Sequence, residues 1–145
     1  QALLARQDDP TGAGPPIVLP DGSTVPRLPS VTRWLWDGAF VGQIGVRWQP
    51  GTPALPPTCL GHVGYAVVPW KQRLGHATRA LALLLDELGD GLRARGLPYV
   101  ELTTNPANVA SQRVIEANGG VLVERFAKPA SHGGGEGLRY RIALG

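Results

Sequence analysis

VVPWKQRLGHA, residues 67–77, is the stretch that decides the fold of this chain. The apolar segment before it, residues 60–68, ends at Pro69 and favours a strand. After the stretch, residues 75–95 predict an amphipathic helix, and Gly96 supplies its stop. The helix prediction rests on apolar residues that recur at three-and-four spacing, namely Ala77, Leu81, Leu84, Leu85, Leu88 and Leu92. The stretch is therefore predicted to be a loop between a strand and a helix.

This loop has the features of a phosphate-binding site. Backbone N–H groups at the start of a helix have no partner within the helix, and the helix dipole favours negative charge there. Gly75 and Ala77 are small where a diphosphate would approach the backbone. The Walker A and Gly-x-Gly-x-x-Gly patterns are both absent, so another pyrophosphate ligand is expected. Taken alone, the loop also fits a capped helix start without a ligand.

A second strand-to-helix junction, NPANVASQRVIEANGG, occupies residues 105–120. It follows a short strand predicted over residues 99–104 and contains a helix predicted over residues 109–117. Asn108 is either the N-cap of that helix or a ligand-contacting residue, two roles that do not exclude each other. Asn105, which precedes Pro106, competes for the cap.

The remaining segments complete a mixed α/β pattern. Residues 31–36 and 40–48 predict a hairpin around an Asp-Gly turn, and residues 121–126 and 138–144 predict a final pair of strands. Strands interleaved with helices predict a mixed sheet, and no internal repeat is present. Residues 1–30 are rich in proline and glycine, so beyond residues 2–6 we expect an irregular arm.

Composition limits the function classes. The chain has 145 residues with 43% hydrophobic and 17% charged residues, which is typical of one globular domain without a membrane span. The net charge of +3 comes from scattered arginines, which makes nucleic-acid binding the weakest alternative. No metal site is expected, because His62, His76 and His132 are far apart. The single cysteine, Cys59, cannot form an internal disulfide, and a reducing cytoplasmic location is expected.

The two junctions together resemble the acetyl-CoA-binding motifs of the GNAT superfamily. Those motifs are a Gln/Arg-x-x-Gly-x-Gly/Ala loop and an Asn-x-x-Ser/Ala helix that ends before a Gly, in the same order. The resemblance covers roughly residues 31–144 and includes a Gly-His-x-Gly-Tyr strand at residues 61–65. It implies a mostly antiparallel α/β sheet with a splayed central strand pair and flanking helices. It divides the chain into an arm, residues 1–30, and a GNAT domain, residues 31–145, that lacks the family's first strand-helix unit.

The resemblance also implies acetyl-CoA as cosubstrate. In such folds the pantetheine arm lies between the strands that match residues 60–68 and 99–104, pairing with backbone near Val67 and Val68, where an N–H would polarise the thioester carbonyl. The residues expected to bind the cofactor are Val67, Val68, Gln72, Arg73, Leu74, Gly75, His76, Ala77, Thr78, Asn108 and Ser111.

The implied reaction is direct transfer of an acetyl group to a primary amine, on a small molecule or a peptide amino terminus. Many GNAT enzymes use a Tyr as general acid four residues after the Ser/Ala of the second motif, and here that position holds Ile115. Ser111 is the candidate to protonate or solvate the thiolate, with capping as its structural alternative. His62 shares a strand face with two small residues and is the candidate base, with a structural histidine as the alternative.

His132 lies in a Gly-rich loop that is either a substrate-facing flap or a mobile tip. A homodimer is one expected assembly. A GNAT-like module that binds acyl-CoA without turnover is the alternative to an enzyme, supported by Ile115.

Overall fold

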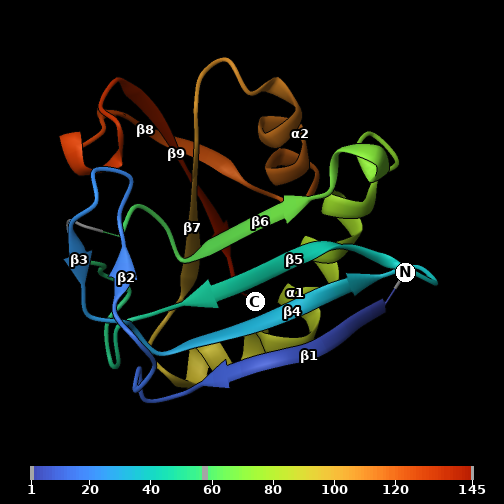
Figure 1. Ribbon diagram of the computed structural model, residues 1–145, viewed down its shortest axis with the longest axis horizontal. Coiled ribbons are helices and arrows are strands. Elements are labelled where there is room, and N and C mark those ends of the chain that lie inside the picture. Colours follow the sequence, from blue (N-terminus) through green and yellow to red (C-terminus); the bar gives the residue numbers. More distant parts are fainter. Residues whose placement is uncertain (1, 57–58, 145) are drawn as a thin grey trace.

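The computed structural model describes residues 2–56 and 59–144 and contains two sheets that diverge from each other (Figure 1). The first sheet has the order β1-β4-β5-β6 and the second the order β7-β9-β8, and all named pairs are antiparallel. The strands of the first sheet are β1 (Ala2–Asp9), β4 (Ser30–Trp36), β5 (Phe40–Arg47) and β6 (Val63–Val67). Those of the second are β7 (Tyr99–Thr104), β8 (Val121–Ala127) and β9 (Glu136–Ala143). The predicted mixed α/β fold is confirmed.

The first thirty residues contain more structure than the sequence predicts. β1 extends to Asp9 and pairs with β4 from Ala2↔Trp36 to Asp9↔Ser30, so it forms the outer strand of the first sheet. A two-stranded hairpin follows, built from β2 (Ile17–Val18) and β3 (Thr24–Val25). The expectation of an irregular segment after residue 6 is wrong. Prolines dominate the composition, but most of them lie in the connections between these strands, where they interrupt no ladder.

Two helices accompany the sheets. α1 (His76–Ala94) lies across one face of the first sheet and contacts β1, β5 and β6, and its buried leucines include Leu81 and Leu84. α2 (Val109–Ala117) packs near the start of α1, where the Asn118 side chain donates to the Thr78 carbonyl at 3.2 Å. These bounds agree with the predicted helices. No helix in residues 2–56 and 59–144 is long and apolar enough to cross a membrane.

A buried arginine ties three of these elements together. Arg33 of β4 donates to Asp8 of β1 at 2.6 Å and to Glu87 of α1 at 3.0 Å, while its own side chain is almost fully enclosed. Burial opposes its charge, but the two carboxylates outweigh that cost and raise the pKa of Arg33. The contact fixes α1 on the face of the first sheet that carries Arg33 and the buried side chains of Leu35 and Ile44. The opposite face of the sheet is therefore left for the site described below.

The adjacent strands β6 and β7 belong to different sheets and meet only at one end. The His62 N–H donates to the Glu101 carbonyl at 2.8 Å, and Gly61 lies so close to β7 that a Cβ there would be 3.0 Å from the same oxygen. Beyond this point the two strands separate, as Figure 1 shows. The splayed central strand pair implied by the family resemblance is therefore present.

Candidate cofactor loop and active site

The loop between β6 and α1 presents a row of backbone donors. It passes through the 3-10 turn η1 (Pro69–Lys71) and then adopts left-handed geometry at Arg73, φ 63°, and at Gly75, φ 80°. Within the described residues, no hydrogen bond uses the backbone N–H of Arg73, Leu74, Gly75, Ala77 or Thr78. Consecutive unused N–H groups at a helix N-terminus form an anion-binding concavity. The structure thus gives the loop the donor surface that its sequence predicts.

Side chains hold this loop in place. The Gln72 amide donates to the Val67 carbonyl at 3.0 Å, and the Arg79 guanidinium donates to the Leu74 carbonyl at 3.0 Å. His76 is buried, and its Nε2 lies 3.4 Å from a carboxylate oxygen of Asp37. We therefore place His76 among the residues that anchor the loop, and not among its ligands. Arg73 and Leu74 leave their side chains exposed at the loop surface.

The edge of β6 beside the gap carries further backbone groups that have no strand partner among the described residues. In the register with β5, the Val68 N–H donates to the Val41 carbonyl at 2.8 Å, and the Val68 carbonyl accepts from Lys71 at 3.0 Å. Both backbone groups of Val68 are therefore used within the protein, which argues against Val68 as a backbone partner of the pantetheine. Alternation along the strand turns the backbone groups of Tyr65 and Val67 toward the gap instead, where the Val67 carbonyl accepts from Gln72 and, in the described part of the chain, the Val67 N–H stays open.

The second junction is organised by Asn108. Its side-chain oxygen accepts from the Ser111 N–H at 3.1 Å, which makes Asn108 the N-cap of α2. The competing Asn105 does not cap the helix, because its side-chain oxygen accepts from the Lys128 ammonium at 2.8 Å. Asn108 also lines a cavity beside the helix start, so its capping role leaves it accessible from that side.

A pair of hydroxyl groups links β6 of the first sheet to α2 near this helix start. The Tyr65 phenol on β6 and the Ser111 hydroxyl on α2 are 2.7 Å apart and hydrogen-bonded. Burial raises the pKa of Tyr65, partly offset by Ser111, so the phenol is protonated at neutral pH. Sequence reasoning missed Tyr65 because the two residues are far apart in the chain. The sequence did offer one signal: Tyr65 lies two residues before Val67 and so shares its strand face.

His62 is enclosed rather than presented to a substrate. Its side chain is 0% exposed, Nδ1 accepts from the Glu101 N–H at 2.8 Å, and Nε2 lies 3.0 Å from the Pro53 carbonyl. Since Nδ1 is an acceptor, Nε2 carries the proton and donates to Pro53. Burial lowers the pKa of His62, so the ring is neutral at pH 7. Both nitrogens are occupied, and the expectation that His62 is the base is replaced by its structural alternative.

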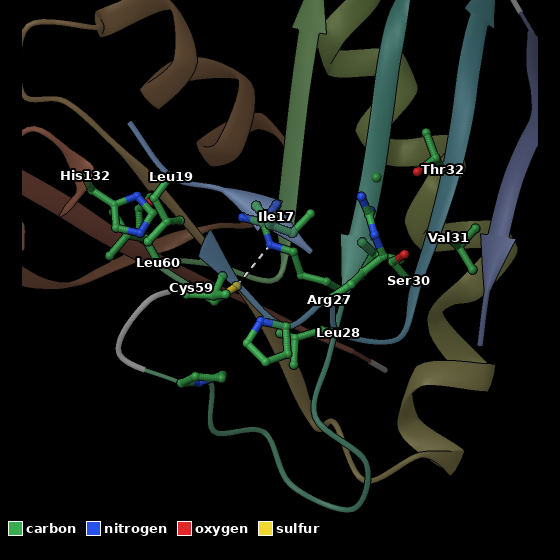
Figure 2. A pocket seen from close by; sticks show the side chains of 17 residues that line it. Ile17, Leu19, Arg27, Leu28, Ser30, Val31, Thr32, Cys59, Leu60 and His132 are labelled. Carbon is green, nitrogen blue, oxygen red and sulfur yellow. Dashed lines mark hydrogen bonds between the residues drawn. The ribbon is translucent and has the colours of Figure 1, made fainter. Parts of the chain in front are cut away.

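A cavity of about 390 Å³ opens beside this region (Figure 2). The β2–β3 hairpin supplies Ile17 and Leu19, the ends of β4 and β5 supply Thr32 and Arg47, and the β8–β9 connection supplies His132. A second cavity of about 240 Å³ shares Leu60, Thr103 and His132 with the first and reaches Asn108. The two cavities therefore adjoin and extend to the start of α2.

A family model for the acetyltransferase (GNAT) domain matches residues 28–121, well over half of the chain. The chain belongs to the GNAT acetyltransferase family. No match was found among curated proteins. The family assignment accounts for the two junctions, the splayed strands and the open donor row with one fold.

Solved structures show the same GNAT fold. The Salmonella typhimurium protein yncA, solved with its cofactor acetyl-CoA, has a TM-score of 0.58 at 17% identity, over 81% of this chain and 65% of that one. Mycobacterium smegmatis RimJ, in complex with CoA-disulfide, has a TM-score of 0.59 at 22% identity, over 79% of this chain and 53% of that one. Vibrio cholerae spermidine N-acetyltransferase, in complex with CoA and spermine, has a TM-score of 0.60 at 14% identity, over 79% of this chain and 66% of that one. The chain thus spans about two thirds or less of these relatives.

Within residues 2–56 and 59–144, no group of three or more His, Cys, Asp or Glu side chains is arranged to hold a metal ion.

Proposed function

We propose that this GNAT domain transfers an acetyl group from acetyl-CoA to a primary amine. The observation that carries the proposal is the set of backbone N–H groups of Arg73, Leu74, Gly75, Ala77 and Thr78, which have no partner among the described residues and lie next to the open edge of β6. A diphosphate would accept from the loop, and the amide-bearing pantetheine arm would pair with the backbone of Val67. The small Gly75 and Ala77 keep the loop backbone accessible to the anion.

Acetyl-CoA supplies an activated acetyl group whose leaving thiolate must gain a proton. Ser111, at the first turn of α2, is the proposed donor, and Tyr65 is its hydrogen-bond partner. A protonated phenol 2.7 Å from the serine hydroxyl can replace the proton that the serine gives up. Tyr65 thus reaches this helix from β6, whereas the position of the usual family tyrosine holds the buried Ile115.

The acceptor amine loses its proton before its nitrogen attacks the thioester carbonyl carbon. His62 has no open nitrogen for this step, so we assign the proton to water in the cavity that extends from the start of α2. As the nitrogen attacks, the new C–N bond forms, and the open N–H of the β6 edge stabilises the negative charge that develops on the oxygen. The nitrogen then gives its second proton to the cavity water, and the C–S bond breaks as the thiolate takes the Ser111 proton.

Acetyl-CoA binding by the purified chain tests the loop. At about 100 times its Kd, the ligand should stabilise the fold by about 2.7 kcal/mol and raise Tm by about 5 °C or more. Gly75→Glu should abolish this shift, because its carboxylate repels the diphosphate. Gly75→Asn is the uncharged comparison: asparagine tolerates the φ of 80°, but its side chain meets Arg79, so it isolates the steric part of the effect and should keep a larger shift than Gly75→Glu. A wild-type shift in both variants would remove the basis for the loop assignment.

The same preparations distinguish an enzyme from a binding module. Release of free CoA thiol on addition of amines is the readout for an enzyme. A module without turnover would bind acetyl-CoA with the same Tm shift and release no thiol above the hydrolysis background with any amine.

A further inference from the structure

We propose that the acceptor amine carries an anionic group, a carboxylate or phosphate, on an apolar body, and that polyamines are poor substrates. This inference rests on the proposed function, because it concerns the second substrate of the same site. It starts from the composition of the two adjoining cavities, which together take in the β2–β3 hairpin, the sheet face opposite α1 and the start of α2.

The charged residues that line the cavities are all basic. Arg27 and Arg47 line the larger cavity, Lys128 lines the smaller one, and His132 lines both. No aspartate or glutamate is among the described lining residues of either cavity. A polycation would enter such a site without a counter-ion, whereas an anion would find several.

Arg47 is the group best placed to recognise that anion. Its Nε is held by the Gly61 carbonyl at 2.8 Å and by the Cys59 sulfur at 3.1 Å, the bond drawn to the yellow sulfur in Figure 2. No hydrogen bond to its Nη1 or Nη2 is present among the described residues. A guanidinium fixed through Nε with both terminal nitrogens available matches the fork geometry that carboxylates and phosphates accept.

The sheet beneath Arg47 is kept clear of side chains. Gly45 pairs with Gly64 across β5 and β6, and a Cβ at Gly64 would lie 3.6 Å from the Arg47 Nη1. A larger residue at Gly64 would therefore lie against the guanidinium, whereas a Cβ at Gly45 would meet the Val31 carbonyl at 3.3 Å and the Thr32 hydroxyl at 3.5 Å. Two glycines opposite each other remove cross-strand side-chain contacts, and the missing side chain at Gly64 leaves room beside Arg47.

Two carboxylates outside the cavity lining interact with its basic residues, Asp9 with Arg27 and Asp21 with His132, and both are held by local hydrogen bonds. Asp9 accepts from the N–H groups of Ala13 and Gly14, both at 2.9 Å, and Asp21 accepts from the backbone and side chain of Ser23. Arg27 donates through its Nε to the Pro15 carbonyl at 2.9 Å and contributes positive charge at the outer end. The wall of the larger cavity also includes the apolar Ile17, Leu19, Val25 and Leu28, together with the hydroxyl-bearing Ser30, Thr32 and Thr103. An amine with an apolar body between its nitrogen and its anionic group fits both features.

The test compares amines that differ only at the end remote from the nitrogen. The wild-type chain with acetyl-CoA is assayed on 6-aminohexanoate against hexylamine and 1,6-diaminohexane, on leucine and phenylalanine against their amides, on O-phosphoethanolamine against ethanolamine, and on spermidine. We expect kcat/KM at least tenfold higher for the anionic member of one or more pairs. The amino-acid and phosphate pairs then distinguish the two anions. Preference for spermidine or the diamine would overturn the proposal.

Variants then assign the preference to Arg47. Arg47→Gln should reduce the ratio of anionic to neutral kcat/KM at least tenfold, and an acetyl-CoA Kd within about twofold of wild type reports that the cofactor side is intact. Arg93→Gln, exposed on α1, is the matched charge-removal control and should keep the wild-type ratio. An unchanged ratio in Arg47→Gln would reject Arg47 as the recognising group. If that variant does not fold, Arg47→Lys keeps the charge without the fork and should still lower the ratio.

These measurements distinguish failure of the anion site from failure of the proposed acetyltransferase function. If acetyl-CoA raises no Tm, the proposed function fails. If acetyl-CoA binds but no amine releases thiol, hexanoate and hexylamine are added to the acetyl-CoA complex and Tm is measured. A shift with hexanoate but not hexylamine supports the anion site, and the reverse, or no shift, overturns it.

Discussion

The imidazole of His62 joins two strands at the point where the sheets separate. The ring accepts from the Glu101 N–H of β7, and the backbone N–H of His62 itself donates to the Glu101 carbonyl, so side chain and main chain together close one end of the gap. Its Nε2 reaches the Pro53 carbonyl in the preceding loop. These contacts explain why a neutral, buried histidine is retained here: it satisfies a donor and an acceptor that a hydrocarbon could not.

Replacing His62 should affect stability more than the pH dependence of catalysis. His62→Ala leaves a buried N–H and a carbonyl without partners and should cost about 2 to 4 kcal/mol in the free energy of unfolding. His62→Asn can keep the bond from Glu101 and should cost less. Urea denaturation at pH 7.5 measures both. If instead the two variants keep the wild-type free energy of unfolding, and their catalytic rate no longer falls at acidic pH, His62 would again be the candidate base.

The lowered pKa of His62 also sets the direction of a pH effect on folding. The unfolded chain takes up this proton near pH 6.5, whereas the folded chain takes it up only at lower pH. The contribution is therefore fully present above about pH 6.5 and is lost as the pH falls below that value. Wild type should lose more stability than His62→Asn between pH 7.5 and 5, measured by urea midpoints. Equal losses would contradict the assignment.

At this scale the sequence predicts residue chemistry better than residue contacts. The alternation around Gly64 places His62 on a definite strand face, but the sequence does not show that the strand becomes irregular before Val63 and turns the ring toward Pro53. The cap role of Asn108 was predictable, because it depends on a neighbour only three residues away. The contacts between segments far apart in the chain could not be predicted in this way.

At the scale of elements, β6 and α2 meet through the Tyr65–Ser111 hydrogen bond. The elements themselves were predicted well: the second junction starts and ends as expected, because its cap, its apolar spacing and its Gly stop are local signals. How α2 sits over the gap is decided by packing against α1 and β7. The bridge between the hydroxyl groups is a product of that packing, which local signals do not encode.

If Tyr65 acts through Ser111, their substitutions should not be additive. Tyr65→Phe and Ser111→Ala should each lower kcat about tenfold or more, and the double variant should lose little beyond the larger single effect. The acetyl-CoA Kd should stay within about threefold, since the bond serves the leaving thiolate. Multiplicative losses in kcat, or parallel losses in Kd and Tm, would indicate that the pair only holds α2 in place.

At the scale of the whole molecule, the chain divides into a cofactor side and an acceptor side. The donor loop and the start of α1 lie at one end of β6, and the hairpin formed by β2 and β3 lies near its other end (Figure 1). Figure 2 shows Leu19 of the hairpin connection next to His132 of the β8–β9 connection, both lining the larger cavity. The hairpin thus covers a cavity, whereas the main core is built from the sheets and α1. Composition alone suggested an irregular arm, because two-residue strands carry almost no periodic signal.

Removing the hairpin should separate substrate recognition from folding. Ile17 and Val25 are paired, so the chain can be closed by replacing residues 17–25 with a short Gly-Ser linker without moving β1 or β4. The cost should be about 3 kcal/mol or less, chiefly the burial of Leu19, which is 7% exposed. The acetyl-CoA Kd should stay within about twofold, because the donor loop does not contact this segment. The kcat/KM for the acceptor should fall at least tenfold, since the cavity loses one wall.

Unfolding followed by circular dichroism and cofactor binding by calorimetry supply the controls. Loss of acetyl-CoA binding in a folded variant would contradict the division into two sides, and an unchanged kcat/KM would place the acceptor elsewhere.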